Sequence, residues 1–165
     1  MSKLSFEIRL LDQADLPQLH QVRNAAFATV YRSFRSLLKG KLVEVVFADA
    51  EDAQGAHLDE ICRKDSCHQV FVAIHKDQVI GFCGASLNRE TAIGTVGLNA
   101  VHPEFSNQGV GTALYEHVLA WMKSQGATAA QVSTGDDPSH MPARKAYEKA
   151  GFEKSIPTRS YYRCL

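Results

Sequence analysis

The sequence predicts a mixed α/β fold in a single domain, from the order of its apolar patterns along the chain. Helical spacing of apolar residues dominates as far as residue 64, and short apolar runs typical of strands follow from residue 69. A strand–helix–strand–helix order then fills the remainder, as expected for an α/β sheet. The 165-residue chain shows no repeat, linker or charge block, so residues 1–165 are expected to form one unit.

The composition is that of an ordinary globular protein, with 45% hydrophobic and 22% charged residues. The 18 basic residues (Lys and Arg) balance the 18 acidic ones, so the formal net charge is zero. Proteins that bind nucleic acid or anionic lipid through charge normally carry a basic surplus. The balance therefore predicts neither a nucleic acid nor a membrane as a partner.

The compartment expected from the sequence is the cytoplasm. The first residues lack the long apolar segment of a signal peptide, and no stretch reaches the roughly 18 apolar residues that a membrane span needs. The four cysteines (Cys62, Cys67, Cys83 and Cys164) are too sparse for a disulfide scaffold and are expected to stay reduced. Cys62 and Cys67 lack the paired Cys-x-x-Cys spacing of a zinc site, so no metal is expected.

The first half of the chain is expected to hold one strand and several helices. Residues 6–10 alternate as a short strand, and Pro17 then suits the first turn of a helix. Apolar residues recur at helical spacing there, at Leu16, Leu19, Val22 and Ala26. The pattern stays mostly helical over residues 31–64, with breaks expected near Gly40 and around residues 49–55.

The second half is expected to combine a strand meander with two helices. A hairpin is predicted from strands over residues 70–74 and 78–86, joined by a polar turn, and Pro103 ends a third strand over residues 93–101. The remaining elements are helices over residues 110–123 and 141–150, and strands over residues 129–134 and 160–163.

The segment that carries chemistry is residues 101–114, where a strand ends in a polar loop and Gly109 and Gly111 open a helix. Free N–H groups at a helix start, with the positive end of the helix dipole, form an anion site. The two glycines carry no side chain to hold a phosphate away from those amides. The segment therefore predicts a phosphate-bearing ligand and favours a diphosphate; the alternative is a tight loop that binds nothing.

Two common phosphate motifs do not match this segment. A P-loop needs a lysine after its last glycine, and none stands here. A dinucleotide fingerprint needs a third glycine where this chain has Leu114, and an acidic residue about 20 positions on, where it has Gln131. The sequence therefore argues against P-loop nucleotide hydrolysis and Rossmann dinucleotide binding.

Motifs on either side of this loop resemble the GNAT superfamily of N-acetyltransferases. They are Leu98-Asn99-Ala100-Val101-His102-Pro103 before it, and Ala143 with Tyr147-Glu148-Lys149-Ala150-Gly151-Phe152 after the next strand. Ile8-Arg9 and Ala14-Asp15-Leu16-Pro17 are similar to the family's first strand and helix. The resemblance runs in order along nearly the whole chain. It implies a central, mostly antiparallel sheet that is splayed at the cofactor cleft and flanked by helices.

The resemblance implies acetyl-CoA as co-substrate. The family holds its diphosphate on the amides of the loop and helix start, which are here Gln108, Gly109, Val110, Gly111, Thr112 and Ala113. The pantetheine arm enters where the strand of Asn99, Ala100 and Val101 parts from the strand of residues 129–134. Ser106 departs from the family's Gln or Arg, and Asn107 stands where glycine is common. Because backbone amides make most of the contact, weakened rather than abolished CoA binding is expected.

Two side chains are assigned to the reacting end of the cofactor by the resemblance. Tyr147 matches the family tyrosine that protonates the departing thiolate, and the alternative is a core aromatic on the apolar face of its helix. His140 matches a position where many members carry an asparagine facing the cofactor. Three roles for His140 stay open: a contact to pantetheine, a base at the reacting centre, or a cap, with Ser139, for the first turn of the helix.

The sequence does not select a general base. The side chains expected near the cleft are Glu90, His102, Glu104 and Asp136. The cations on the helix of Tyr147 are Arg144, Lys145 and Lys149. These cations form either a solvated face or a contact to the remaining phosphates.

The function expected is transfer of an acetyl group from acetyl-CoA to a primary amine, carried by a small molecule or a peptide. Direct transfer in a ternary complex is favoured, because neither Cys62 nor Cys67 stands beside a clear base. The alternatives are transfer of another acyl group, or a non-catalytic sensor of acyl-CoA, which the Ser106 and Asn107 departures favour. The identity of the acceptor stays open, as does the choice between a monomer and a homodimer.

Overall fold

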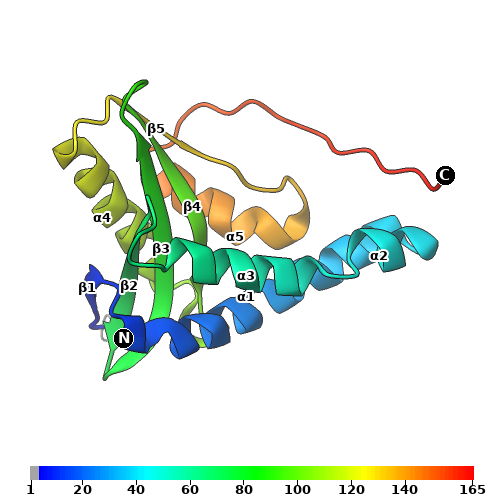
Figure 1. Cartoon of the computed structure of the whole chain (residues 1–165), viewed down its shortest axis with the longest axis horizontal. Coiled ribbons are helices and arrows are strands. Elements are labelled where there is room, and N and C mark those ends of the chain that lie inside the picture. Colours follow the sequence, from blue (N-terminus) through cyan, green and yellow to red (C-terminus); the bar gives the residue numbers. More distant parts are fainter. Residues whose placement is uncertain (1–3) are drawn as a thin grey trace.

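A five-stranded sheet forms the centre of the computed structural model, which describes residues 4–165 (Figure 1). Its strands follow in chain order: β1 (Glu7–Leu10), β2 (Gln69–His75), β3 (Gln78–Asn88), β4 (Ile93–Val101) and β5 (Ala129–Val132). The pairs β1–β2, β2–β3 and β3–β4 are antiparallel, and β4–β5 is parallel. The mixed α/β class and the mostly antiparallel sheet are therefore confirmed.

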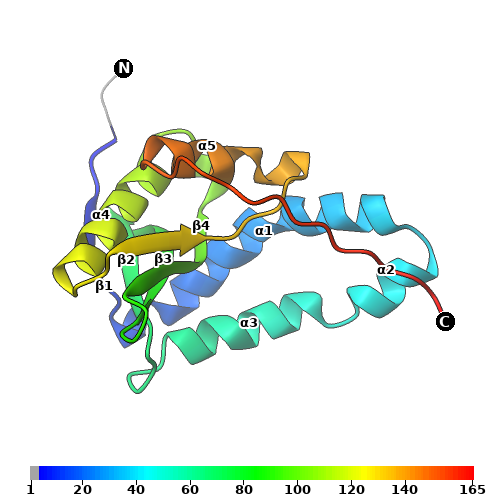
Figure 2. The same ribbon diagram turned by 90° about the horizontal axis from the view of Figure 1, so that it is seen from above.

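Helices cover both faces of this sheet (Figure 2). The α-helices are α1 (Leu16–Leu38), α2 (Lys41–Val46), α3 (Ala50–Ile61), α4 (Val110–Ser124) and α5 (Met141–Lys149). Short 3-10 turns precede three of them: η1 (Gln13–Asp15), η2 (Pro103–Phe105) and η3 (Pro138–His140). No helix within residues 4–165 is long and apolar enough to cross a bilayer.

The core has two halves, because successive residues of β2 and β3 point to opposite faces of the sheet. On one face, Phe71 and Cys83 pack with residues of α4 and with Tyr147 of α5. On the other face, Val72 and Phe82 pack with Leu19 and Val22 of α1 and with Leu58 and Ile61 of α3. The two helical layers are thus held by alternate side chains of the same two strands.

The helical region differs from expectation at one of its two breaks. The chain does break at Gly40, whose φ is 57°. Residues 50–55, however, belong to α3, so the second break is shorter than expected. Gly55 leaves the space that the Arg23 guanidinium of α1 occupies, because a Cβ there would lie 2.7 Å from its Nη1. That buried guanidinium donates to the Glu51 carbonyl oxygen at 2.8 Å and joins the two helices.

The strand expected over residues 160–163 is absent, and this expectation was wrong. The chain after Gly151 has no regular element and extends away from the sheet (Figure 1). Tyr161 is 86% exposed and Tyr162 49% exposed, so the aromatic residues of 160–163 do not reach the core. A strand needs a hydrogen-bonded neighbour, and β5 pairs with β4 alone within residues 4–165.

The Arg23–Gly55 contact predicts that Gly55→Ala changes the free energy of unfolding in opposite directions with and without the Arg23 side chain. Alanine normally stabilises a helix by about 1 kcal/mol relative to glycine. In the wild-type background, Gly55→Ala should instead lower the free energy of unfolding by about 1 kcal/mol, because it displaces a hydrogen bond from a charged group. In an Arg23→Ala background the same substitution should stabilise. Urea unfolding of the four proteins measures both effects, and stabilisation in both backgrounds would contradict the contact.

Candidate active site

The parallel pairing of β4 with β5 covers only half of β4. The paired residues run from Ile93 opposite Ala129 to Val96 opposite Val132, where β5 ends. Residues 97–101 continue β4 with no strand on that side. We call residues 97–101 the parted end of β4. The splay that the family resemblance implies is therefore present.

A β-bulge lies where the parted end begins. The β3–β4 register shifts between Cys83 and Ala85, so that Gly97 and Leu98 both lie opposite Gly84. A bulge bends its strand and increases the local twist. A Cβ on Gly84 would lie 3.3 Å from the Leu98 carbonyl oxygen, so the bulge approaches β3 closely at this point. The bend and the end of the β5 pairing thus coincide.

Asn99, on the parted end, joins two buried tyrosines. Its Nδ2 donates to the Gly97 carbonyl oxygen at 2.8 Å and to Oη of Tyr147 at 3.2 Å. Its Oδ1 accepts from Oη of Tyr115 on α4 at 2.7 Å. The rings of Tyr115 and Tyr147 have centroids 4.6 Å apart. One amide side chain therefore connects β4, α4 and α5.

Both tyrosines of this cluster hold their protons at neutral pH. Burial raises the pKa of Tyr147, more than the hydrogen bonds with Asn99 and Tyr115 lower it. Burial likewise raises the pKa of Tyr115, and the adjacent Tyr147 adds to the effect. The Tyr147 oxygen accepts from Asn99 Nδ2 at 3.2 Å, and its own O–H donates only over 3.4 Å, to Asn99 Oδ1, which already accepts from Tyr115.

A thiol also lies near this cluster but cannot act as a nucleophile. Cys83 pairs with Asn99 in the β3–β4 register and is completely buried. Burial raises the pKa of its thiol, so it carries no thiolate at neutral pH. The Cys83 side chain is therefore part of the core.

The start of α4 presents backbone amides that no side chain caps. Gly109 is the N-cap, and it makes no side-chain cap hydrogen bond. The first helical bond runs from the Ala113 amide to the Gly109 carbonyl oxygen at 3.0 Å, so the amides of Val110, Gly111 and Thr112 precede the helical ladder. Ala113, predicted to bind the cofactor through its amide, already uses that group within the helix.

Of the two glycines in this segment, Gly109 has a backbone conformation that favours glycine, and Gly111 does not. Gly109 has a φ of 85°, a left-handed conformation that suits glycine. Asn107 also has a positive φ, 60°, which asparagine tolerates better than most residues. A Cβ on Gly111 would make only ordinary contacts, the nearest at 3.7 Å from Cγ2 of Val101. That contact shows that the helix start lies against the parted end of β4.

The loop after β5 holds a histidine–carboxylate pair. Nδ1 of His140 lies 2.5 Å from Oδ1 of Asp137, and the His140 ring stacks on Phe34 of α1 with centroids 5.6 Å apart. The other carboxylate oxygen, Oδ2 of Asp137, accepts from the Ser139 amide at 3.0 Å. Asp137 is thus the cap of η3, and His140 makes no cap bond. His140 stands at the N-cap position of α5 but makes no side-chain cap bond there, so the capping role is not observed.

The structure separates the other predicted side chains. Glu90 lies in the turn before β4, so the length of that strand separates it from Asn99, and the expected position near the cleft was wrong. Nδ1 of His102 accepts a hydrogen bond from the Glu104 amide at 3.4 Å, which makes His102 the cap of η2. Arg144 donates to the carbonyl oxygens of Gly135 and Asp137 and so holds the loop in place.

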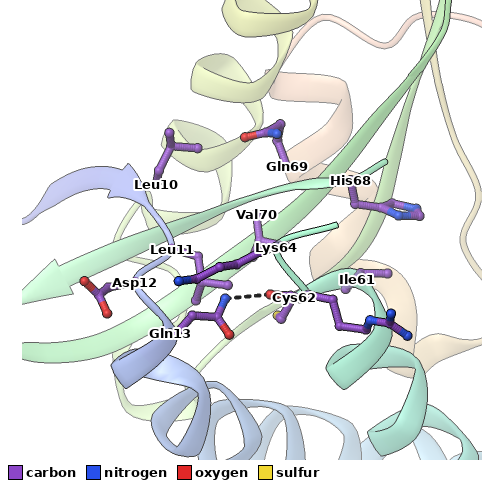
Figure 3. Close-up of a pocket in the computed structure, with 11 residues that line it drawn as sticks. Leu10, Leu11, Asp12, Gln13, Ile61, Cys62, Lys64, His68, Gln69 and Val70 are labelled. Atoms are coloured by element: carbon purple, nitrogen blue, oxygen red, sulfur yellow. Dashed lines mark hydrogen bonds between the residues drawn. The ribbon is translucent and has the colours of Figure 1, made fainter. Parts of the chain in front are cut away.

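Two hollows in the described part of the chain are lined by residues outside the parted end. One, of about 330 Å³, lies between the end of β1 and the end of α3, where Gln13 Nε2 donates to the Cys62 carbonyl oxygen at 2.7 Å (Figure 3). Burial raises the pKa of the Cys62 thiol to about 11. A second hollow, of about 460 Å³, is lined by Thr29, Arg32, Ser33, Ser36, Pro138 and Ser139. In the described part of the chain, no three His, Cys, Asp or Glu side chains gather as a metal site would require.

Solved structures share this fold. PaiA N-acetyltransferase from Thermoplasma acidophilum, in complex with coenzyme A, matches with a TM-score of 0.73 and 18% identity over 94% of each chain. A putative GNAT acetyltransferase from Desulfovibrio desulfuricans matches with a TM-score of 0.70 and 18% identity, over 92% of this chain and 87% of the other. AAC(6')-Iy in complex with a bisubstrate analogue, CoA-S-monomethyl-acetylneamine, matches with a TM-score of 0.65 and 20% identity, over 98% of this chain and 99% of the other.

Comparison by sequence identifies the family directly. No curated protein matches the chain. The model of the acetyltransferase (GNAT) family matches residues 30–152, which include β2 to β5, the start of α4 and Tyr147. With the splayed sheet and the uncapped helix start in place, the chain belongs to the GNAT acetyltransferase family.

Proposed function

We propose that the protein transfers an acetyl group from acetyl-CoA to a primary amine, by direct attack of the amine in a ternary complex. One observation carries this proposal: the uncapped start of α4 lies against the parted end of β4, and Tyr147 is bonded to that same end. The arrangement brings together a diphosphate site, an unpaired strand edge and a proton donor. These would bind the diphosphate, the pantetheine arm and the thioester sulfur of acetyl-CoA.

The diphosphate would bind at the loop and helix start formed by Gln108, Gly109, Val110, Gly111, Thr112 and Ala113. Three free amides and the positive end of the helix dipole would face the diphosphate there. The N–H of Ala113 is bonded within the helix, so Ala113 only lines the site. The pantetheine arm carries amide groups, and an extended chain of amides can bond to an open strand edge. Asn99, Ala100 and Val101 supply that edge, and His140 lies at the start of α5 on the acceptor side.

Chemically, the neutral amine attacks the thioester carbonyl, a C–N bond forms, and the C–S bond breaks. Tyr147 then gives its proton to the departing sulfur, since its O–H makes only one long bond, 3.4 Å to Oδ1 of Asn99, which it can exchange for a bond to sulfur. Alignment of amine and thioester supplies much of the rate. An acyl-enzyme on Cys62 or Cys83 is disfavoured, because burial raises the pKa of both thiols. Neighbours crystallised with CoA or with a CoA-linked amine support the choice of substrates.

The experiment that tests the function follows release of free CoA thiol from acetyl-CoA. The acceptors are 1,4-diaminobutane, neamine and a lysine-containing peptide, and mass spectrometry identifies the acetylated product. Thiol release that depends on an amine is the expected result. CoA binding without thiol release from any of the three would instead support the acyl-CoA sensor.

The diphosphate site predicts that Gly109→Ala weakens CoA binding. An L-residue in the left-handed conformation costs about 1–2 kcal/mol. Relaxation of this strain moves the amides that follow, so the dissociation constant for CoA should rise about tenfold. Isothermal titration calorimetry measures it.

The matched control is Gly126→Ala, at a φ of 92° just beyond the other end of α4. It should carry similar strain and leave CoA affinity unchanged. Equal loss of affinity in both variants would show that helix stability, and not the amide site, governs binding. A dissociation constant of the wild type weaker than millimolar would contradict the site itself.

The acid role predicts that Tyr147→Phe lowers kcat by about 100-fold while CoA affinity is retained. The phenyl ring keeps the packing against Tyr115 and removes the one proton that the sulfur can take. Tyr31→Phe is the control, because it removes another buried hydroxyl, bonded to the Ala50 carbonyl oxygen at 3.1 Å, away from the parted end. An unchanged kcat in Tyr147→Phe would remove the acid role.

A further inference from the structure

The Asp137–His140 pair is more fully built than a chance surface contact. The Asp137 carboxylate accepts from Ser33 Oγ on α1 at 3.0 Å, from the Ser139 amide at 3.0 Å and from the Ser139 hydroxyl. Burial alone would raise the pKa of Asp137, but the hydrogen bonds from Ser139, His140 and Ser33 lower it to about 2. Asp137 is therefore a carboxylate throughout the neutral range, held by α1 and by its own loop.

The backbone at Gly135 packs closely against the Asp137–His140 pair. A Cβ on Gly135 would lie 2.6 Å from Oδ1 of Asp137 and 2.7 Å from Nδ1 of His140, so a glycine is needed there. Nη1 of Arg144 donates to the Gly135 carbonyl oxygen at 2.6 Å and to that of Asp137 at 3.0 Å. Phe34 then covers one face of the His140 ring. Backbone, cation and aromatic ring together hold the imidazole in one orientation.

This orientation determines which nitrogen of His140 is available. A carboxylate only accepts hydrogen bonds, so Nδ1 carries the proton shared with Asp137. Nε2 then has a lone pair in the neutral ring. Among the described residues Nε2 has no partner, and the one buried side-chain nitrogen without a partner is Nε of Arg23, so Nε2 is open to solvent or substrate.

The pair also lies beside the proposed reaction site. His140 begins the helix that carries Tyr147 seven residues later, which places both on one face of α5, about 10 Å apart along its axis. The pair follows β5, at the end where β4 and β5 part. A substrate between the parted strands and α1 would therefore meet His140 from one side and the thioester from the other.

We propose that His140 is the general base of the transfer, accepting a proton from the acceptor ammonium at Nε2, and that Asp137 is its positioning residue. This inference rests on the proposed function. An alkylammonium has no lone pair for attack and is mostly charged at neutral pH, since its pKa is about 10. A base beside the thioester converts it to the neutral amine where it reacts.

The proton balance is complete within the proposed reaction. The ammonium gives one proton to Nε2 of His140, which passes it to solvent. The neutral nitrogen forms the C–N bond, the C–S bond breaks, and Tyr147 gives its proton to sulfur. The second proton lost by nitrogen restores the Tyr147 hydroxyl. The products are the N-acetyl amine, CoA thiol and one released proton.

The test compares wild type with His140→Asn and Asp137→Asn in the thiol-release assay, with whichever of the three amines reacts fastest. Asparagine at position 140 keeps an N–H donor for Asp137 and cannot take the proton. Asparagine at position 137 keeps an oxygen acceptor for the Ser139 amide and loses the charge. CoA affinity by calorimetry and the urea unfolding midpoint establish that each variant is folded and binds its cofactor.

The pH dependence separates a base from a structural role. At pH 7, His140→Asn should lower kcat/KM about 100-fold, and Asp137→Asn should lower it less. The deficit should shrink about tenfold for each pH unit toward pH 10, because the free amine fraction rises at that rate below the amine pKa. Charged groups around the pair include Asp136 and Asp137 of the loop, Arg144 of α5 and Arg32 of α1, and the aspartates and arginines keep their charge across this range.

The matched control is His20→Asn, which breaks a second histidine–carboxylate pair, His20 Nε2 to Asp59 Oδ1 at 2.7 Å, between α1 and α3. It should leave kcat/KM unchanged at every pH. A deficit in His140→Asn that is equal from pH 7 to pH 10, or no deficit at all, would overturn the base role. Wild type that releases no thiol with any amine would overturn the proposed function itself, and the base role with it.

Discussion

The pairing of β4 with β5 stops at Val96 and Val132, and the rest of the site depends on that stop. Backbone N–H and C=O groups in a folded protein are almost always paired. Residues 97–101 of β4 nevertheless lack a strand on one side, so they form an open edge of the sheet. The bulge opposite Gly84 bends β4 at the same point, and the uncapped start of α4 lies against its last residue. In the proposed function, an extended, anionic ligand would bind along this open edge and at the helix start together.

Asn99 links this opening to the two helices that complete the site. Its side chain binds Tyr115 of α4 through Oδ1 and Tyr147 of α5 through Nδ2, inside an otherwise apolar cluster. A buried polar network of this kind is stable only when every member has a partner. The Tyr147 O–H makes the longest of these bonds, 3.4 Å to Oδ1 of Asn99, so it is the member of the network most easily redirected to another acceptor. On the far side of the opening, Asp137 imposes a comparable specificity on His140, through one carboxylate bonded to two elements.

Much of the framework follows from local sequence. β4 begins and ends where its apolar run and Pro103 predict, and α4 begins immediately after Gly109 as its glycines predict. These elements are readable because their signals, a proline, a left-handed glycine and a helical apolar period, act on neighbouring residues. Gly55 shows the opposite case, since its local signal predicts a break, but it lies within α3, where it leaves space for the Arg23 side chain of α1. The segment over residues 160–163 also misleads, because its apolar residues have no strand to pair with.

The sequence by itself determined the order of the elements, the glycine-opened helix and the family motifs around Asn99 and Tyr147. Those are properties of residues close together in the chain, and periodicity and turn chemistry suffice to reveal them. Only the tertiary structure decided that Ser33 and Phe34 of α1 hold the Asp137–His140 pair. It also decided where β5 stops pairing with β4. These contacts join residues that are distant in sequence, and their energies depend on distance and burial, which no linear pattern encodes.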